Sequence, residues 1–172
     1  AGGAYINQLR LTIDGLDVER FRQGWQAVLE RHEVLRARFV WEGQAQALQA
    51  IQRSVQLPLT VLDCAPDDLD RLALEQREQG FDLHQAPLLR LVLVPLAAQC
   101  YELIYTSHHI LMDGWSNAQL LGEVLQHYAG QVPAPVTGRY TDYVGWLLAQ
   151  DAHASEQFWS AQLHMLPAPT LL

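Results

Sequence analysis

Residues 101–128 read YELIYTS-HHILMDGWS-NAQLLGEVLQHY, with the nonamer His108–Ser116 at the centre. The first seven residues are rich in aromatic and β-branched side chains, which is typical of a strand. Residues 117–128 form a helix-like run, so the nonamer is predicted to be a strand-to-helix turn. Loops held by rigid elements carry function more often than cores do, which makes this turn the leading candidate for chemistry.

The paired histidines of the nonamer suit proton chemistry. Histidine is the one common side chain that titrates near neutral pH. Neighbouring side chains of an extended segment point to opposite sides, so we expect His108 and His109 to have different roles. One is expected to be packed and hydrogen-bonded while the other faces a cavity. Gly114 suits a turn that needs a positive φ or a close backbone approach, and Ser116 is interpreted as the N-cap of the following helix.

Two roles are open for Asp113, the carboxylate of the nonamer. It could orient a catalytic histidine, or it could be a buried anion that pairs with an arginine and fixes the loop. The second role is favoured, because burying an unpaired carboxylate is costly. A metal site is disfavoured because adjacent histidines rarely converge on one ion and no further His or Cys is suitably spaced. Ser107 and Ser116 lie outside any Gly-x-Ser-x-Gly elbow, which disfavours a serine nucleophile.

The patterns on both sides of the nonamer predict a mixture of strands and helices. Strands are expected at 5–13, 37–41, 45–51, 59–62, 88–94 and 101–107. Helices are expected from Asp17 to near His32, from Pro66 to Gly80, and at 117–128, 141–152 and 155–166. Residues 37–41 and 45–51 are expected to form a hairpin around Glu42-Gly43. Because strands and helices do not alternate strictly, we predict an α/β chain built as an α+β two-layer sandwich. Its sheet would be mixed and largely antiparallel, with helices packed on it.

Composition narrows the classes of function. The chain has 172 residues, of which 49% are hydrophobic, and this is enough for one globular domain with a real core. A net charge of −8 disfavours nucleic acid as a partner. No apolar run approaches the ~20 residues that span a bilayer, and the first residues lack the basic region of a signal peptide. We therefore expect a cytoplasmic protein without a membrane partner. The missing initiator Met suggests either a fragment of a longer chain or a processed protein.

A second informative segment is Arg31-His-Glu-Val-Leu-Arg-Ala-Arg-Phe39. It closes the first long helix and runs into a strand. Taken alone, it is typical of a charged helix C-terminus, where cations are favoured by the helix dipole.

Together, the two segments resemble the condensation domain of nonribosomal peptide synthetases. That family carries His-His-x-x-x-Asp-Gly, followed in peptide-forming members by Trp-Ser, as at Trp115 and Ser116. Its upstream motif, Arg-His-Glu-x-Leu-Arg-Thr-x-Phe, is matched from Arg31 to Phe39 except that Ala37 replaces Thr. Its downstream motif, Tyr-x-Asp-Tyr-Ala-x-Trp, is matched by Tyr140, Asp142, Tyr143 and Trp146, whereas Val144 and Gly145 depart mildly from the family's pattern. The resemblance covers nearly the whole chain.

The resemblance implies a lobe like chloramphenicol acetyltransferase. The family has two such lobes, with the active site in a tunnel between them. Residues 1–166 would be the N-terminal lobe, and 167–172 would begin a linker to the C-terminal lobe. The family's opening motif and that second lobe are absent from this sequence.

The resemblance also implies an activity, which is amide formation between donor and acceptor thioesters held on carrier domains. His109 would be the catalytic residue, either as a general base or as a positioning group, and His108 would be structural. Asp113 would pair with Arg31, and Gly114 would leave room for the acceptor arm.

The implied partners are the donor and acceptor peptidyl carrier domains, the adjacent synthetase modules and the missing C-terminal lobe. No cofactor or metal would be bound directly, because phosphopantetheine arms of the carriers deliver both substrates. The fragment is expected to be inactive alone. Two alternatives stay open: a non-catalytic docking lobe for a carrier domain, or another His-x-x-x-Asp-Gly acyltransferase.

Overall fold

The structure is a computed structural model that describes residues 5–164 and 166. The chain divides into two compact units, Ala1–Val136 and Thr137–Leu172. The first unit holds the nonamer and the Arg31–Phe39 segment. The second holds the downstream aromatic motif.

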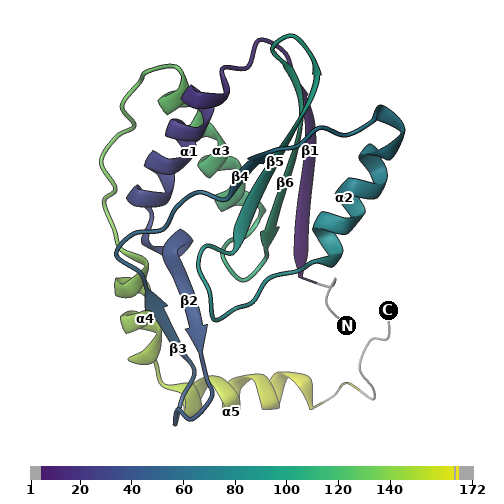
Figure 1. Ribbon diagram of the computed structural model, residues 1–172. Coiled ribbons are helices and arrows are strands. Elements are labelled where there is room, and N and C mark those ends of the chain that lie inside the picture. The colour runs from purple at the N-terminus through teal and green to yellow at the C-terminus, as the bar shows by residue number, and fades with distance from the viewer. Residues whose placement is uncertain (1–4, 165, 167–172) are drawn as a thin grey trace. The chain divides into compact units, whose positions relative to one another are not determined.

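A mixed sheet of four strands forms the middle of the first unit, in the order β1-β6-β5-β4 (Figure 1). Its strands are β1 (Ile6–Ile13), β4 (Leu59–Val61), β5 (Leu89–Ala97) and β6 (Cys100–His108). β6 pairs antiparallel with both β1 and β5, whereas β4 and β5 are parallel. The predicted mixed and largely antiparallel sheet is therefore confirmed. β6 lies between two partners, and the nonamer begins at its last residue.

The expected hairpin is present as a separate two-stranded sheet of β2 (Ala37–Val40) and β3 (Leu48–Ile51). Its strands are shorter than predicted. Gly43, within the predicted turn, has a φ of 69°, which a residue with a Cβ rarely adopts. The short 3₁₀ helix Glu33–Arg36 leads from the first long helix into β2.

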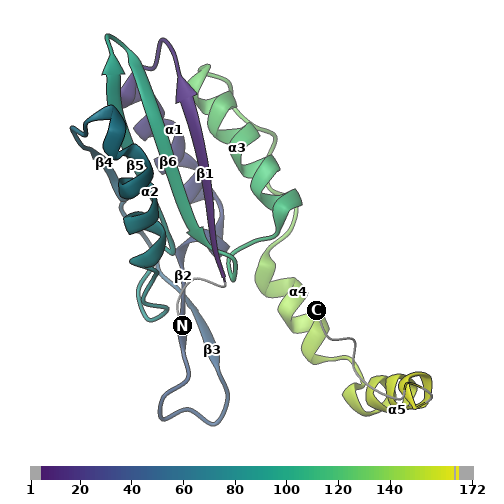
Figure 2. The ribbon, with the colours of Figure 1, turned by 90° about the vertical axis from the view of Figure 1, so that its right-hand side faces the viewer.

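Helices cover both faces of the four-stranded sheet. α1 (Val18–Arg31) and α3 (Gly114–Tyr128) lie on one face, and α2 (Leu69–Glu78) lies on the other (Figures 1 and 2). The larger core is on the first face, where buried side chains of both helices meet those of β5 and β6; it includes Trp25, Leu29, Leu91, Tyr105 and Val124. α2, preceded by the 3₁₀ turn Pro66–Asp68, adds a smaller cluster around Ala73, Val92, Val94 and Ile104.

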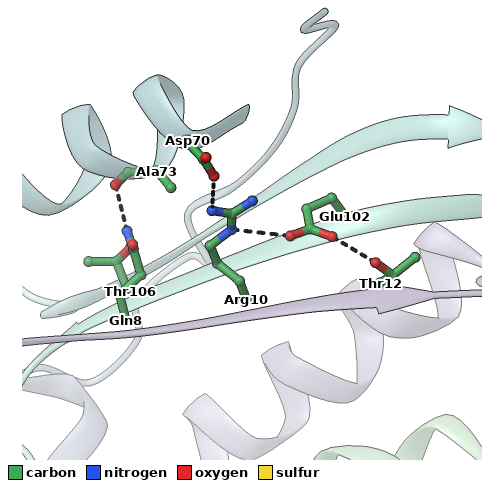
Figure 3. Close-up of polar contacts among 7 residues, drawn as sticks. All are labelled: Gln8, Arg10, Thr12, Asp70, Ala73, Glu102 and Thr106. Atoms are coloured by element: carbon green, nitrogen blue, oxygen red, sulfur yellow. Dashed lines mark hydrogen bonds and ion pairs between the residues drawn. The ribbon is translucent and has the colours of Figure 1, made fainter. Parts of the chain in front are cut away.

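Polar side chains attach α2 to the sheet (Figure 3). Gln8 and Arg10, alternate residues of β1, contact this helix, and Thr12 lies on the same face of the strand. The contacts run from Gln8 to the carbonyl of Ala73 at 2.8 Å, from Arg10 to Asp70 at 2.6 Å and to Glu102 at 3.2 Å, and from Thr12 to Glu102 at 2.9 Å. Glu102 is only 8% exposed, so these partners replace the water that its carboxylate loses. The alternate residues of β1 consequently face α1 and α3.

The second unit contains the two predicted helices, α4 (Tyr140–Leu148) and α5 (Ala152–Leu163). α4 is shorter than expected, whereas α5 has the expected length of 12 residues but begins three residues earlier than predicted. Three aromatic rings of the downstream motif follow one another along α4: Tyr140 lies against Tyr143 at a tilt, and Tyr143 stacks on Trp146. The linker expected at 167–172 lies outside the described residues. Within the part of the chain that the structure describes, no helix is long and apolar enough to cross a bilayer.

α1 and α3 approach each other closely at Gly24. A Cβ built on this glycine would lie 3.1 Å from the backbone oxygen of Val124, which is tighter than ordinary packing. Gly122 of α3 is helical as well, but a Cβ there would meet nothing within 4 Å. Substituting alanine at each of these two glycines therefore separates the effect of packing from the effect of helix propensity.

We predict that Gly24→Ala lowers the free energy of unfolding by about 1–3 kcal/mol, because the added methyl forces two backbones apart. Gly122→Ala is the matched control and should raise that free energy by up to about 1 kcal/mol, through helix propensity alone. Urea denaturation of both variants measures the difference. Equal effects of the two substitutions would contradict the close approach of the helices.

Candidate active site

The end of β6 is anchored to β1 by its backbone. In the register of the two strands, His108 lies opposite Ile6. The N–H of His109 donates to the carbonyl of Tyr5 at 2.7 Å, one residue beyond the last strand pair. The backbone at the start of the nonamer is therefore held by the sheet, although the residues that follow form a turn.

His109 has an exposed side chain with one defined partner. The side-chain amide nitrogen Nδ2 of Asn7 lies 2.9 Å from Nδ1 of His109. Asn7 belongs to the face of β1 that is turned toward α1 and α3, two residues before Leu9, which packs on the larger core. Nε2 of His109 makes no hydrogen bond to any other described residue.

His108 has a different environment. Its ring is half-buried and stacks on Tyr5, with ring centroids 6.2 Å apart. The N–H of Ile110 donates to its Nδ1 at 3.1 Å. Burial lowers the pKa of His108, and the neighbouring His109 adds to the effect, which favours the neutral ring at pH 7. The two rings thus differ in burial and partners, as their opposite directions led us to expect.

Asp113 caps α3. Its Oδ1 accepts from the N–H of Ser116 at 2.8 Å, and its backbone oxygen accepts from Asn117 at 3.0 Å. The bond from the backbone of Ser116 is the main cause of the lowered pKa of Asp113. The N-cap predicted at Ser116 is therefore wrong, because the helix begins at Gly114, three residues earlier than expected.

Gly114 does not serve as the expected turn glycine. It is the first residue of α3, and it is absent from the glycines with positive φ. A Cβ built on it would meet nothing within 4 Å, so no close backbone approach requires a glycine either. The space beside Gly114 is nevertheless open.

Arg31 pairs with a different carboxylate from the one expected. Its Nε lies 3.0 Å from Oε2 of Glu123, and its guanidinium also donates to the carbonyl of Ala134. Nε2 of His32 lies 2.7 Å from the same Oε2. The expected Asp113–Arg31 pair is wrong for a physical reason: the carboxylate of Asp113 is exposed and already accepts from its own helix.

Residues of the Arg31–Phe39 segment and of the nonamer line a common pocket of about 220 Å³. It lies where α1 ends and α3 begins, and its lining includes Val34 and Leu35 from the first segment and Met112 and Ser116 from the nonamer. His109 is not among the lining residues.

Two residues of the candidate site were not predicted from the sequence. Asn7 is polar in a strand whose same-face neighbours are Leu9, Leu11 and Ile13, and this break in the pattern was its only signal. Glu123 lies beside the buried Val124 of α3, so a half-buried carboxylate that needs a cation could have been suspected there.

A model of the protein family described as "Condensation domain" matches residues 1–172. The chain belongs to the condensation-domain family. The resemblance found in the motifs is thereby confirmed.

Similar proteins are large synthases. The chain is 35% identical to a linear gramicidin synthase of Brevibacillus parabrevis over 183 residues. It is 40% identical to Chondramide synthase cmdD of Chondromyces crocatus over 182 residues. The matches cover 99% and 98% of this condensation-domain chain but only 2% and 5% of those proteins.

Solved structures confirm the fold expected for a condensation domain, which is like chloramphenicol acetyltransferase. The X-domain from teicoplanin biosynthesis matches with a TM-score of 0.83 and 30% identity, over 99% of this chain and 41% of that one. The starter condensation domain of rhizomide synthetase RzmA matches with a TM-score of 0.81 at 20% identity, which speaks for the fold alone. In both cases the chain spans less than half of the solved structure.

We predict that Glu123→Ala destabilises the chain more than Asp113→Ala does. Removing Glu123 leaves Arg31 without its ion-pair partner and His32 without the carboxylate at its Nε2, which should lower the free energy of unfolding by about 1–3 kcal/mol. Glu75→Ala, which breaks the exposed pair with Arg71, is the matched control and should change little. Thermal melting ranks the variants, and a larger loss in Asp113→Ala would contradict the assignment of partners.

The pH dependence of the Asp113 variants tests the cap itself. Because the folded pKa of Asp113 is lowered, its stabilising effect is present above the unfolded pKa of about 3.9 and is lost as the pH falls through the folded pKa. The gap in melting temperature between wild type and Asp113→Ala should therefore narrow in acid. Asp113→Asn keeps an acceptor for Ser116 and should lie between them at pH 7.

Proposed function

We propose that this chain forms part of a condensation domain that joins two carrier-bound thioesters through an amide bond. The observation that carries the proposal is the placement of His109. Its ring is held at the end of a central strand, the residue is exposed, and the residues around it match the family motif.

The proposed reaction needs little acid–base assistance. The amine nitrogen of the acceptor attacks the thioester carbon of the donor, the C–N bond forms, the C–S bond breaks, and the proton lost by nitrogen ends on the departing sulfur. A free α-amine titrates at about 7.7–8.0, so a useful fraction is unprotonated near neutral pH. The remaining tasks are to position the two reactants and to stabilise the carbonyl oxygen as it gains charge.

Each motif residue has a role in this proposal. His109 is the catalytic residue, and His108 supports the turn in its neutral form. Asp113 begins α3 at the required place, and the open space beside Gly114 admits the acceptor arm. Arg31 holds the end of α1 against α3 through Glu123.

The proposed partners follow from the family. Donor and acceptor carrier domains present both substrates on phosphopantetheine arms, and adjacent synthetase modules supply those carriers. The domain itself holds no cofactor of its own, and the complex acts in the cytoplasm. Residues 1–166 serve as the N-terminal lobe, opposite a second lobe; the greater length of the matched structures supports this division.

A non-catalytic docking lobe is the second candidate. One similar structure, with a TM-score of 0.83 and 27% identity, is a complex of the X-domain and OxyB from teicoplanin biosynthesis. A domain of this fold can thus serve as a binding partner. The exposed histidine and its ordered surroundings favour catalysis here.

We predict that His109→Ala, placed in a complete condensation domain, abolishes amide formation without unfolding the protein, because its ring is exposed and contributes little to the core. Product is measured by mass spectrometry with donor and acceptor carriers loaded in advance. His153→Ala is the matched control, since it removes another exposed imidazole, from α5. Full activity of His109→Ala with intact folding would leave the docking function as the better assignment.

We also predict that the 172 residues alone form no amide bond. His109 is exposed on this polypeptide, so a second wall is needed to hold two arms in place beside it. Held geometry is worth effective molarities of about 10⁵–10⁸ M in favourable cases, so its loss removes most of the rate. The assay is the same two-carrier reaction. Robust turnover by the purified monomer would show that a second lobe is unnecessary.

A further inference from the structure

We propose that Asn7 is a positioning residue that sets the tautomer of His109, so that the neutral ring carries its proton on Nε2 and acts as a hydrogen-bond donor. The assignment of the tautomer stands on geometry alone. The catalytic role of this tautomer rests on the proposed function. It makes His109 a hydrogen-bond donor rather than a general base.

The contact between the two side chains fixes the direction of the hydrogen bond. Nδ2 of Asn7 lies 2.9 Å from Nδ1 of His109. An amide nitrogen only donates, so Nδ1 must accept and therefore carries no proton. A neutral imidazole has one donor and one acceptor nitrogen, which places its proton on Nε2.

The strand pair holds both partners of this bond. Asn7 lies opposite Ser107 in the register of β1 and β6, and His109 follows two residues later on the same face. The carbonyl of Tyr5 receives the backbone N–H of His109. The start of β1 and the residue before it thus hold His109: Tyr5, which precedes the strand, fixes its backbone, and Asn7 fixes its ring.

Among the described residues, no carboxylate takes the place of Asn7 at Nδ1. Histidine bases in enzymes commonly have a carboxylate at that nitrogen, which holds a proton on Nδ1 and leaves the lone pair of Nε2 free. Here the nearest motif carboxylate, Asp113, accepts from the backbone of Ser116. The arrangement therefore favours the opposite tautomer from that of a histidine base.

In the proposed reaction, His109 stabilises the thioester oxygen, and the departing thiolate takes the proton. The Nε2–H group of His109 donates to the thioester oxygen, which gains negative charge as the amine attacks. The amine proton passes to the departing thiolate, directly or through water, and His109 keeps its own proton throughout. Bonds and protons balance without any acid–base step at the histidine.

Nitrogen-15 NMR of histidine-labelled protein measures the tautomer directly in the complete condensation domain, at a pH where the imidazole is neutral. Wild type should show the Nε2–H form. Asn7→Asp offers only acceptors, so the proton should move to Nδ1. Gln8→Ala is the matched control, because Gln8 is the next residue of β1 but contacts Ala73 and Thr106 on the opposite face; its His109 signals should equal those of wild type.

The rate of condensation supplies the second readout. Asn7→Asp should lower kcat by about 10²–10³-fold, the usual effect of losing one donor to a developing oxyanion, with little change in KM. A wild-type spectrum of the Nδ1–H form, or full activity of Asn7→Asp with an inverted tautomer, would overturn the inference. Full activity of His109→Ala would instead contradict the proposed catalytic function, while the tautomer measured by NMR would still stand.

Discussion

The antiparallel pairing of β1 with β6 is the interaction on which the site depends. Its register places Asn7 and His109 on the face of the sheet that packs against α1 and α3. The same register places Gln8, Arg10 and Thr12 on the opposite face, where they bind α2 and Glu102. A slip by one residue would exchange the faces, separating Asn7 from His109 and turning Arg10 toward the apolar core.

Periodicity alone predicted most of the secondary structure of the first unit. Apolar side chains recur with the period of their element, so β1, α1 and β6 could be located within one or two residues of their observed ends. The difference between His108 and His109 also followed from strand geometry, because adjacent side chains point to opposite sides. These are local properties, which a short stretch of sequence determines.

The choice of partners could not be predicted in the same way. Asp113 and Ser116 are both good N-cap residues three positions apart, and only the structure shows that Asp113 caps α3. The pairing of Arg31 with Glu123 depends on how α1 lies against α3, and Asn7 meets His109 only because two distant strands share a register. Such contacts are set by tertiary packing, which leaves little trace in local patterns.

Native-state hydrogen exchange at the backbone amide of His109 tests most directly whether β1 holds the turn that carries His109. This N–H donates to the carbonyl of Tyr5 at 2.7 Å. We expect exchange as slow as that of the amides within β6, even though the side chain of His109 is exposed. Exchange at the rate of an unstructured loop would contradict it, because the histidine would then belong to a mobile turn that the strand pair does not fix.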